Sequence, residues 1–300
     1  MDPKLHPDTT DDTLPSAVNQ QSLLIIHRNV DTEMPPRAFS DTLGREGLGE
    51  LVHSHQQADH WTNRTFGLAV SGAGLTRHNS TTLISAAANT AFNVVASAHT
   101  SQPPELRSWL ADMDTLHAAA RGRSPQHVRL SHAAAWQAFW NRSHIMVGAG
   151  ANASEPQTKN DTDTVTRKYA ATRYVQALQS QTDWPIKYTL LFNGMLFGSN
   201  LPPLADFRDW GANNWWQNTR LPYWNMFASG DQEALTHLFE YYLQMRPLLE
   251  DRTQTYFGHA GIFTTETKTL FGLFTPPDYS KTRGPGEQLG CGFWWRLIIL

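Results

Sequence analysis

The first hundred residues alternate between apolar and polar positions in short runs. Ser22–Ile26 is a compact apolar run, Phe66–Ser71 alternates with period two, and Phe92–His99 does the same. Period-two alternation is typical of half-buried strands, and Gly72-Ala-Gly74 supplies the backbone freedom that a hairpin turn needs. Several short strands divided by Gly and Asn predict a β-sandwich or barrel.

After Ser101-Gln-Pro-Pro104 the spacing of apolar residues becomes helical. Apolar positions recur every three or four residues in Leu106–Leu116, His132–Trp140 and Ala170–Leu178, which predicts amphipathic helices. A further helix is predicted to begin with a capping pattern at Ser229 and to kink or end at Pro247. Strands followed by helices predict two segregated domains rather than alternating βαβ units.

Composition excludes several classes of protein. The 300 residues are 40% hydrophobic and 17% charged, with a net charge of −3, which argues against nucleic-acid binding. The one cysteine, Cys291, cannot form an intrachain disulfide, and no Cys/His set has zinc spacing. No apolar stretch is long enough for a membrane span, and nucleotide-binding loops are absent. We therefore expect no metal, no cofactor and no membrane or nucleic-acid partner.

Five Asn-x-Ser/Thr sequons indicate a secretory route. They begin at Asn63, Asn79, Asn141, Asn152 and Asn160. The chain opens MDPKLHPDTTDD, without the apolar region of a signal peptide. We expect an extracellular or secretory parent protein whose leader is not part of this chain.

The segment Asp206–Trp224 concentrates aromatic and amide side chains. It contains four Trp together with Tyr223, Asn218, Gln217 and Arg220. Buried amides and guanidinium groups each need partners, so such a mixture favours a polar binding surface. Flat rings beside amide donors suit a sugar, whereas a base-stacking site would need a basic background. Packing of the tryptophans between helices is the structural alternative.

A second polar-aromatic run, Tyr256–Glu266, carries His259 between two glycines and ends on a carboxylate. Glycoside hydrolysis usually needs two carboxyl groups, one donating a proton to the leaving oxygen and one activating water or attacking. Glu266 is a candidate for the acid, and hydroxyl binding or a structural role is its alternative.

Five motifs in this order resemble a known family. They are Trp136-Gln-Ala-Phe-Trp-Asn-Arg-Ser143, Arg173-Tyr-Val-Gln-Ala-Leu178, Pro185-Ile-Lys-Tyr188, Trp215-Trp-Gln-Asn-Thr-Arg-Leu-Pro-Tyr-Trp224, and Tyr256-Phe-Gly-His259 through Glu266. Together they resemble the domain of unknown function 5703 family of the six-hairpin glycosidase superfamily. They are more distantly similar to the α-L-fucosidases of glycoside hydrolase family 95.

The resemblance implies a β-sandwich followed by an (α/α)₆ toroid. On this basis we expect a partial β-sandwich over 1–103 and a helical linker over 104–130. Residues 131–280 would form about half of the toroid, and 281–300 stay unassigned. The chain would then be an incomplete glycosidase.

The resemblance also implies residue roles at one mouth of the toroid. Asn218 matches the fucosidase Asn that orients an attacking water, whereas Trp216 and Arg220 stand where those enzymes carry Asn and Gln. Trp215, Trp216, Tyr223 and Trp224 would form a sugar platform; Gln217, Arg220, His259 and Lys187 would bind hydroxyls. We expect a glycosidase-like hydrolase acting with inversion, with Asn218 and Glu266 as its catalytic residues. The alternative is a non-catalytic or vestigial carbohydrate-binding protein.

Overall fold

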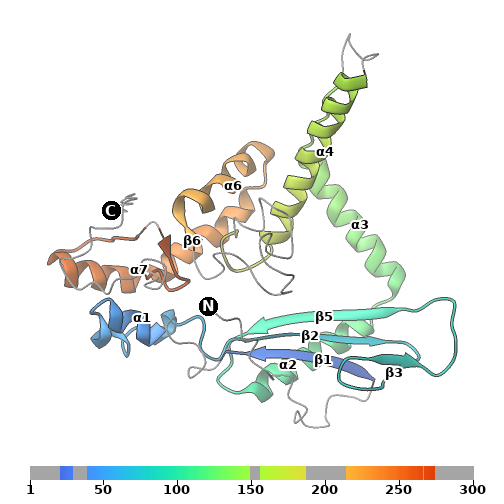
Figure 1. Cartoon of the computed structure of the whole chain (residues 1–300), viewed down its shortest axis with the longest axis horizontal. Helices are drawn as coiled ribbons and strands as arrows, with labels where there is room; N and C mark the ends of the chain where they lie inside the picture. The colour runs from blue at the N-terminus through green and yellow to red at the C-terminus, as the bar shows by residue number, and fades with distance from the viewer. Residues whose placement is uncertain (1–20, 30–38, 149–155, 187–213, 266, 274–300) are drawn as a thin grey trace. The chain divides into compact units, whose positions relative to one another are not determined.

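The computed structural model describes residues 21–29, 39–148, 156–186, 214–265 and 267–273. Two compact units are present. The first comprises residues 1–39 and 59–131, and the second comprises 40–58 and 132–300. A small sheet region near the N-terminus is followed by helices (Figure 1), which confirms the order of strands and helices predicted from the periodicity.

The first unit is built on a three-stranded antiparallel sheet in the order β1-β2-β5. These strands are Ser22–Arg28, Thr65–Gly72 and Val94–Ser101. β2 is the central strand, and its Gly67 pairs with Ile26 of β1 on one side and with His99 of β5 on the other. β3 (Leu75–Arg77) and β4 (Leu83–Ser85) form a separate hairpin after β2.

Helix α2 (Leu106–Arg121) covers one face of this sheet (Figure 1). Trp109, 0% exposed, and Met113 pack against Ile26 and Ala69. The indole lies directly over Gly67, where an added Cβ would come within 2.8 Å of its Cη2. Glycine at this position therefore permits the close approach of the helix to the sheet.

The opposite face of the sheet is apolar and open. Strand alternation places Ile25, Phe66 and Val94 on it, and all three are about half exposed. The face toward α2 instead carries Ser71 and Ser97. This distribution is consistent with a sheet that is one layer of the expected sandwich, although a second large sheet is not among the described residues.

The second unit is mostly helical. Its main helices are α3 (Pro125–Arg142, shared with the first unit), α4 (Pro156–Gln179), α6 (Trp216–Ser229) and α7 (Leu235–Phe257). α6 and α7 form a hairpin whose core includes Tyr223, Met226, Leu235 and Leu238. Two-residue strands β6 (Asn214–Trp215) and β7 (Thr267–Lys268) pair antiparallel beside it.

A segment from early in the sequence belongs to this second unit. It contains α1 (Phe39–Arg45) and the 3₁₀ turns Gly49–Leu51 and Gln56–Ala58. Nε2 of buried His55 donates to an Asp251 oxygen 2.7 Å away. Buried Arg252 forms an ion pair with buried Glu46, at 3.3 Å. The His55–Asp251 hydrogen bond and the Glu46–Arg252 ion pair thus hold residues 40–58 against the C-terminal half of α7.

Two details of the predicted final helix are wrong, namely its start at Ser229 and the alternative that it ends at Pro247. Ser229 is the last residue of α6, where its hydroxyl donates to Asp231 at 2.6 Å and lies 3.3 Å from the Met226 carbonyl oxygen, so it does not cap α7. A 3₁₀ turn (Gln232–Ala234) leads into α7 instead. α7 also continues through Pro247 to Phe257. Pro247 lies on the exposed side of the helix, where the carbonyl group that proline leaves unbonded is open to solvent rather than buried.

Candidate functional site

Pairing of β6 with β7 joins the two polar-aromatic segments of the sequence. Asn214 lies opposite Lys268, and Trp215 lies opposite Thr267. The tryptophan-rich block and the run that ends near residue 266 are therefore neighbours at the start of α6. Glu266 and Lys187 lie outside the described residues, as does the side chain of Trp215.

Trp216 opens α6 with its ring packed edge-on against Tyr242 of α7, at a centroid distance of 5.7 Å. Behind Tyr242 lies Lys268, 1% exposed, whose ammonium is 5.1 Å from the Tyr242 ring centroid. That ammonium also donates to the Thr265 carbonyl at 3.3 Å. A desolvated cation on an aromatic face contributes about 2 kcal/mol. This aromatic-cation cluster fixes β7 against the helical hairpin.

Tyr223 faces inward rather than toward solvent. It is 2% exposed, and its hydroxyl accepts a hydrogen bond of 2.8 Å from the Ile186 backbone N–H. Burial raises the pKa of Tyr223 to about 12 although the Ile186 bond lowers it. Its ring thus holds the segment around Ile186 to α6, and it offers no face to a ligand.

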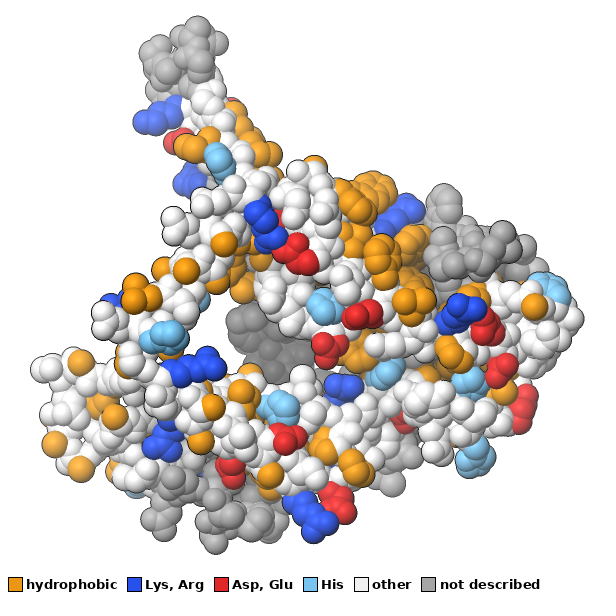
Figure 2. Space-filling model, turned by 180° about the vertical axis from the view of Figure 1, so that it is seen from behind, with side chains coloured by type: hydrophobic (Ala, Val, Ile, Leu, Met, Phe, Trp, Pro, Cys, Tyr) orange, Lys and Arg blue, Asp and Glu red, His pale blue; other side chains and the backbone are white. Residues whose placement is uncertain are grey.

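One face of α6 is aromatic, polar and open. The Trp224 side chain is 59% exposed, and the Arg220 guanidinium carbon lies 5.4 Å from its ring centroid. Gln217 is exposed on the same side. Phe227 is also exposed, and hydrophobic side chains gather over α6 and α7 in Figure 2. This α6 surface, defined by Gln217, Arg220 and Trp224, combines a flat ring with hydrogen-bond donors.

Asn218 lies on a different side of α6. Helical geometry places it about 120° around the axis from Trp224 and about 20° from Asn225. Asn225 in turn exchanges two hydrogen bonds with Gln176 of α4, at 3.1 and 3.2 Å. Asn218 is half-buried, so its amide borders the junction of α4 and α6 rather than the α6 surface.

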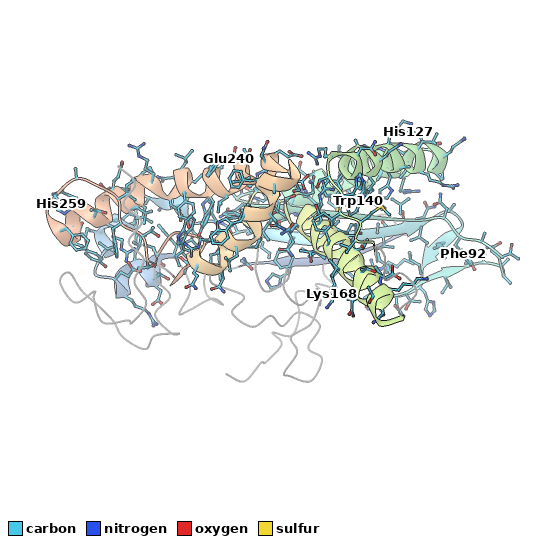
Figure 3. All side chains as sticks on the ribbon, turned by 90° about the horizontal axis from the view of Figure 1, so that it is seen from above. Phe92, His127, Trp140, Lys168, Glu240 and His259 are labelled. Carbon is cyan, nitrogen blue, oxygen red and sulfur yellow. The ribbon has the colours of Figure 1, made fainter. Side chains whose placement is uncertain are left out.

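His259 lies at the far end of α7 (Figure 3). It follows Gly258, whose φ of 71° ends the helix in the left-handed conformation. Its Nδ1 donates to the Ala260 carbonyl at 2.8 Å, and its ring stacks on Phe257. Fifteen residues separate Phe257 from Tyr242, which corresponds to about 22 Å of helix. His259 therefore stands apart from the Trp216 cluster.

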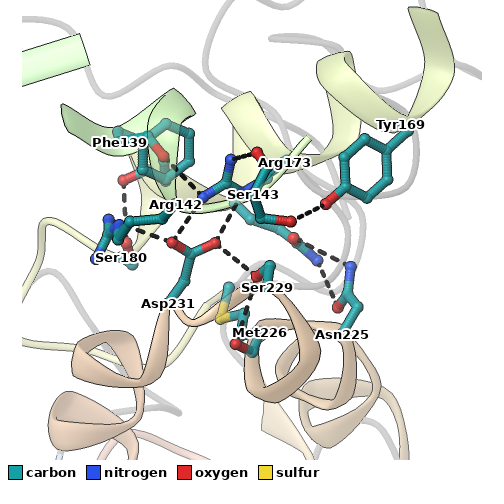
Figure 4. A network of polar contacts seen from close by, with 12 residues as sticks. Phe139, Arg142, Ser143, Tyr169, Arg173, Ser180, Asn225, Met226, Ser229 and Asp231 are labelled. Carbon is teal, nitrogen blue, oxygen red and sulfur yellow. Dashed lines mark hydrogen bonds and ion pairs between the residues drawn. The ribbon is translucent and has the colours of Figure 1, made fainter. Parts of the chain in front are cut away.

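A buried ionic network anchors the hairpin next to the candidate site (Figure 4). Arg173 of α4 donates to both carboxylate oxygens of Asp231, at 2.9 and 3.0 Å, and its guanidinium lies 4.0 Å from the Phe139 ring centroid. Burial raises the pKa of Asp231, but hydrogen bonds from Arg173 and Ser229 and the nearby arginine charges lower it overall. Asp231 is held ionised, which makes it unsuitable as a general acid near neutral pH.

Sequence reasoning did not identify this network or Lys268 as part of the site. The Arg173-Tyr-Val-Gln-Ala-Leu178 motif is one of the five that carry the family resemblance, and its Arg173 and Gln176 are residues that bind the α6–α7 hairpin. An inward-facing pair of polar residues three positions apart on a helix was the available signal. The sequence around Lys268 carries no signal of its burial, because a lysine between threonines is usually solvated.

Within the described ranges, no group of three or more His, Cys, Asp or Glu side chains is placed to hold a metal ion. None of the helices there is long and apolar enough to cross a membrane.

Comparison with known proteins identifies a family match over the N-terminal part of the chain. Residues 2–145 match the N-terminal part of a family described as a domain of unknown function (DUF5703). This match covers the first unit and extends through α3. No curated protein and no solved structure matches the chain significantly.

Proposed function

We propose that this chain is a glycosidase-like protein that binds oligo- or polysaccharides on the α6 surface. The observation that carries the proposal is the half-exposed Trp224 ring flanked by Arg220 and Gln217. A sugar ring has apolar C–H faces and a rim of hydroxyl groups. An exposed indole can stack on the C–H faces, and guanidinium and amide groups can donate hydrogen bonds to the hydroxyl groups.

The proposed reaction is hydrolysis of a glycosidic bond with inversion, at one mouth of a helical toroid. Glu266 is the proposed general acid. Asn218, which borders the junction of α4 and α6 rather than the α6 surface, is assigned the orientation of the attacking water from the family resemblance alone. Support for Glu266 comes from its chain neighbour Thr267, which pairs with Trp215. Inverting enzymes separate their two carboxyl groups by roughly 6.5–9.5 Å to admit water. The proposal assigns no second carboxyl group.

The remaining predicted residues take supporting roles in the proposal. Trp215 and Trp216 extend the platform, whereas Lys187 and His259 bind hydroxyls of longer saccharides. Tyr223 acts from the core, by holding Ile186 against α6. No cofactor enters this reaction.

A non-catalytic carbohydrate-binding protein is the second candidate. The specific observation in its favour is that Asp231, the carboxylate nearest in sequence to α6, is committed to Arg173 and Ser229. Such a protein needs the aromatic surface alone and no acid.

Saccharide binding and release of reducing sugar should be measured on one preparation against a panel of polysaccharides. We expect Trp224→Ala to weaken binding by about tenfold or more, because central aromatic anchors dominate recognition. Phe66→Ala is the matched control, since Phe66 is a similarly exposed aromatic residue on β2. Unchanged binding in the Trp224 variant would refute the α6 surface.

Catalysis is tested separately with Glu266→Gln and Asn218→Ala. We expect both to abolish sugar release while leaving binding intact, and the first anomer formed by the parent chain to be inverted. Turnover that survives both substitutions would refute the catalytic assignment. Binding without turnover in the parent chain would select the second candidate.

A further inference from the structure

The hairpin of β3 and β4 presents one of the sequons at its tip. Residues 78–82 connect the two strands, and the loop is closed by a 2.9 Å hydrogen bond from the His78 N–H to the Thr82 carbonyl. Arg77 Nε donates to the Asn79 carbonyl at 3.2 Å. Asn79, Ser80 and Thr81 are all exposed. The whole sequon is therefore accessible in the folded chain.

The Asn79 side chain has one defined orientation. Its Oδ1 accepts hydrogen bonds from the Thr81 backbone N–H at 2.9 Å and from the Thr81 hydroxyl at 3.2 Å. A backbone N–H only donates, so the atom that faces it must be the amide oxygen. The amide nitrogen, Nδ2, consequently points away from the turn, and no described residue bonds to it.

Asn63 is held quite differently. Its Oδ1 accepts from Arg28 Nη2 at 2.9 Å, and its backbone adopts a φ of 64°. The sequon hydroxyl of Thr65 is fully buried and donates to the Asn63 carbonyl rather than to its side chain. Access to this sequon requires β2 to open.

Asn141 and Asn160 lie within helices α3 and α4. Residues two apart on a helix are separated by about 200°, so the sequon hydroxyl cannot reach the amide. Ser143 Oγ instead contacts the Tyr169 hydroxyl at 2.9 Å, and Thr162 Oγ1 donates to the Lys159 carbonyl. The fifth sequon, at Asn152, lies outside the described residues.

We propose that Asn79 is a site of N-linked glycosylation that is modified in the folded protein. The donor class is an oligosaccharide on a lipid pyrophosphate, delivered by an oligosaccharyltransferase. Nδ2 attacks C1 of the first sugar and forms a C–N bond. The C1–O bond breaks, the lipid pyrophosphate leaves with its electron pair, and one amide proton passes to a transferase carboxylate.

This site is independent of the proposed saccharide-binding surface. Asn79 belongs to the first unit, whereas Trp224 belongs to the second. The glycan at Asn79 is covalently attached, and its attachment requires neither Trp224 nor Glu266. Failure of one proposal leaves the other intact.

The test compares the folded chain with its own peptides. Purified full chain, and separately synthetic peptides that each span one whole sequon with its flanking residues, are incubated with a single-subunit oligosaccharyltransferase and a lipid-pyrophosphate glycan. Site occupancy is read by peptide mass spectrometry. In the folded chain, we expect Asn79 to react at least about tenfold faster than Asn63, Asn141 or Asn160, because those sites need local opening. In the peptides this difference should disappear.

Two variants sharpen the experiment. Thr81→Ser keeps a hydroxyl and should remain modified at Asn79, whereas Asn79→Gln should lose only that modified peptide. An unmodified Asn79 in the folded chain, or equal rates at another described sequon, would overturn the proposal.

Discussion

Arg173 and Asp231, 58 residues apart in the sequence, are joined by two parallel hydrogen bonds in the interior of the helical unit. Arg173 is 2% exposed, and its guanidinium group also donates to the Phe139 and Ser143 carbonyls. Such bidentate pairs fix the relative orientation of the two elements that carry them. Here they fix α4 and the end of α3 to the turn between α6 and α7.

Asp231→Asn should therefore destabilise the helical unit strongly. Breaking a buried pair leaves an unpaired charge on Arg173 and costs about 3–5 kcal/mol. The free energy of unfolding, measured by urea denaturation at pH 7, checks this value. Glu250→Gln is the control, since it breaks an exposed i,i+4 pair with Arg246 worth only about 0.3–0.5 kcal/mol. Equal losses in the two variants would contradict the prediction.

The same pair predicts acid sensitivity. The pKa of Asp231 in the folded chain is below its ordinary value of 3.8, because bonds and charges from the arginines outweigh burial. A depressed carboxyl pKa stabilises the fold above the ordinary value, and this contribution is lost as the pH falls through the folded pKa. Unfolding midpoints measured from pH 6 to pH 2.5 should fall less steeply in Asp231→Asn than in the parent chain.

His117 predicts a second pH effect, in the sheet unit. Its Nε2 and Nδ1 lie 2.8 and 2.9 Å from the hydroxyls of Ser71 and Ser97. Burial and the charge of Arg121 lower the pKa of His117 below 6.5. The neutral ring stabilises the fold at higher pH, and that contribution is lost as the pH falls below about 6.5. NMR titration of the ring and thermal unfolding at pH 5 and 7.5 test it; His127→Gln on exposed α3 should leave the pH dependence unchanged.

Gly67→Ala should disrupt the contact between α2 and the sheet. The added methyl group would lie 2.8 Å from Trp109 Cη2 and closer still to the Ile25 carbonyl. Overpacking of this kind costs about 1–3 kcal/mol. Gly44→Ala, a position with open space around it, should have little effect on stability. The thermal unfolding midpoint of both variants measures the change in stability. The fluorescence of Trp109, above the background of the other tryptophans, reports the change in its environment.

Tyr223→Phe should destabilise the α6–α7 hairpin, because it removes one buried hydroxyl group. Without it, the Ile186 N–H loses its acceptor, at a cost of about 1–3 kcal/mol. The raised pKa of Tyr223, about 12, also means that the neutral phenol stabilises the fold fully below pH 10. This contribution disappears as the pH rises toward 12. The phenylalanine variant should show a shallower loss of stability over that interval.

Local periodicity predicted the elements of the fold well. Alternation at Phe66–Ser71 became β2, and the apolar spacing of Leu106–Leu116 became α2 with Trp109 and Met113 inward. These features depend on neighbours within a few residues. The covered face of β5 was not predictable in this way, because the helix packs on Ser97 and His99 while Val94 stays exposed.

The candidate site depends on contacts between residues far apart in the sequence. It was therefore predicted less completely than the helices and strands. Residue types suggested Trp224 and Arg220, and both lie together on α6. Tyr223 belongs to the same segment but faces inward, since helix geometry separates neighbours by 100°. The pairing of Trp215 with Thr267 and the burial of Lys268 require strand register across more than fifty residues, which no local pattern encodes.

The contacts between residues 40–58 and α7 can form only late in the synthesis of the chain. His55 and Glu46 leave the ribosome long before their partners Asp251 and Arg252 exist. At 5–20 residues per second, the intervening chain takes roughly 10–40 s to translate. During that time His55 and Glu46, both buried in the folded chain, lack the side chains of α7 that they contact. Residues 40–58 can thus reach their folded contacts only after α7 has been translated, although they are among the first residues made.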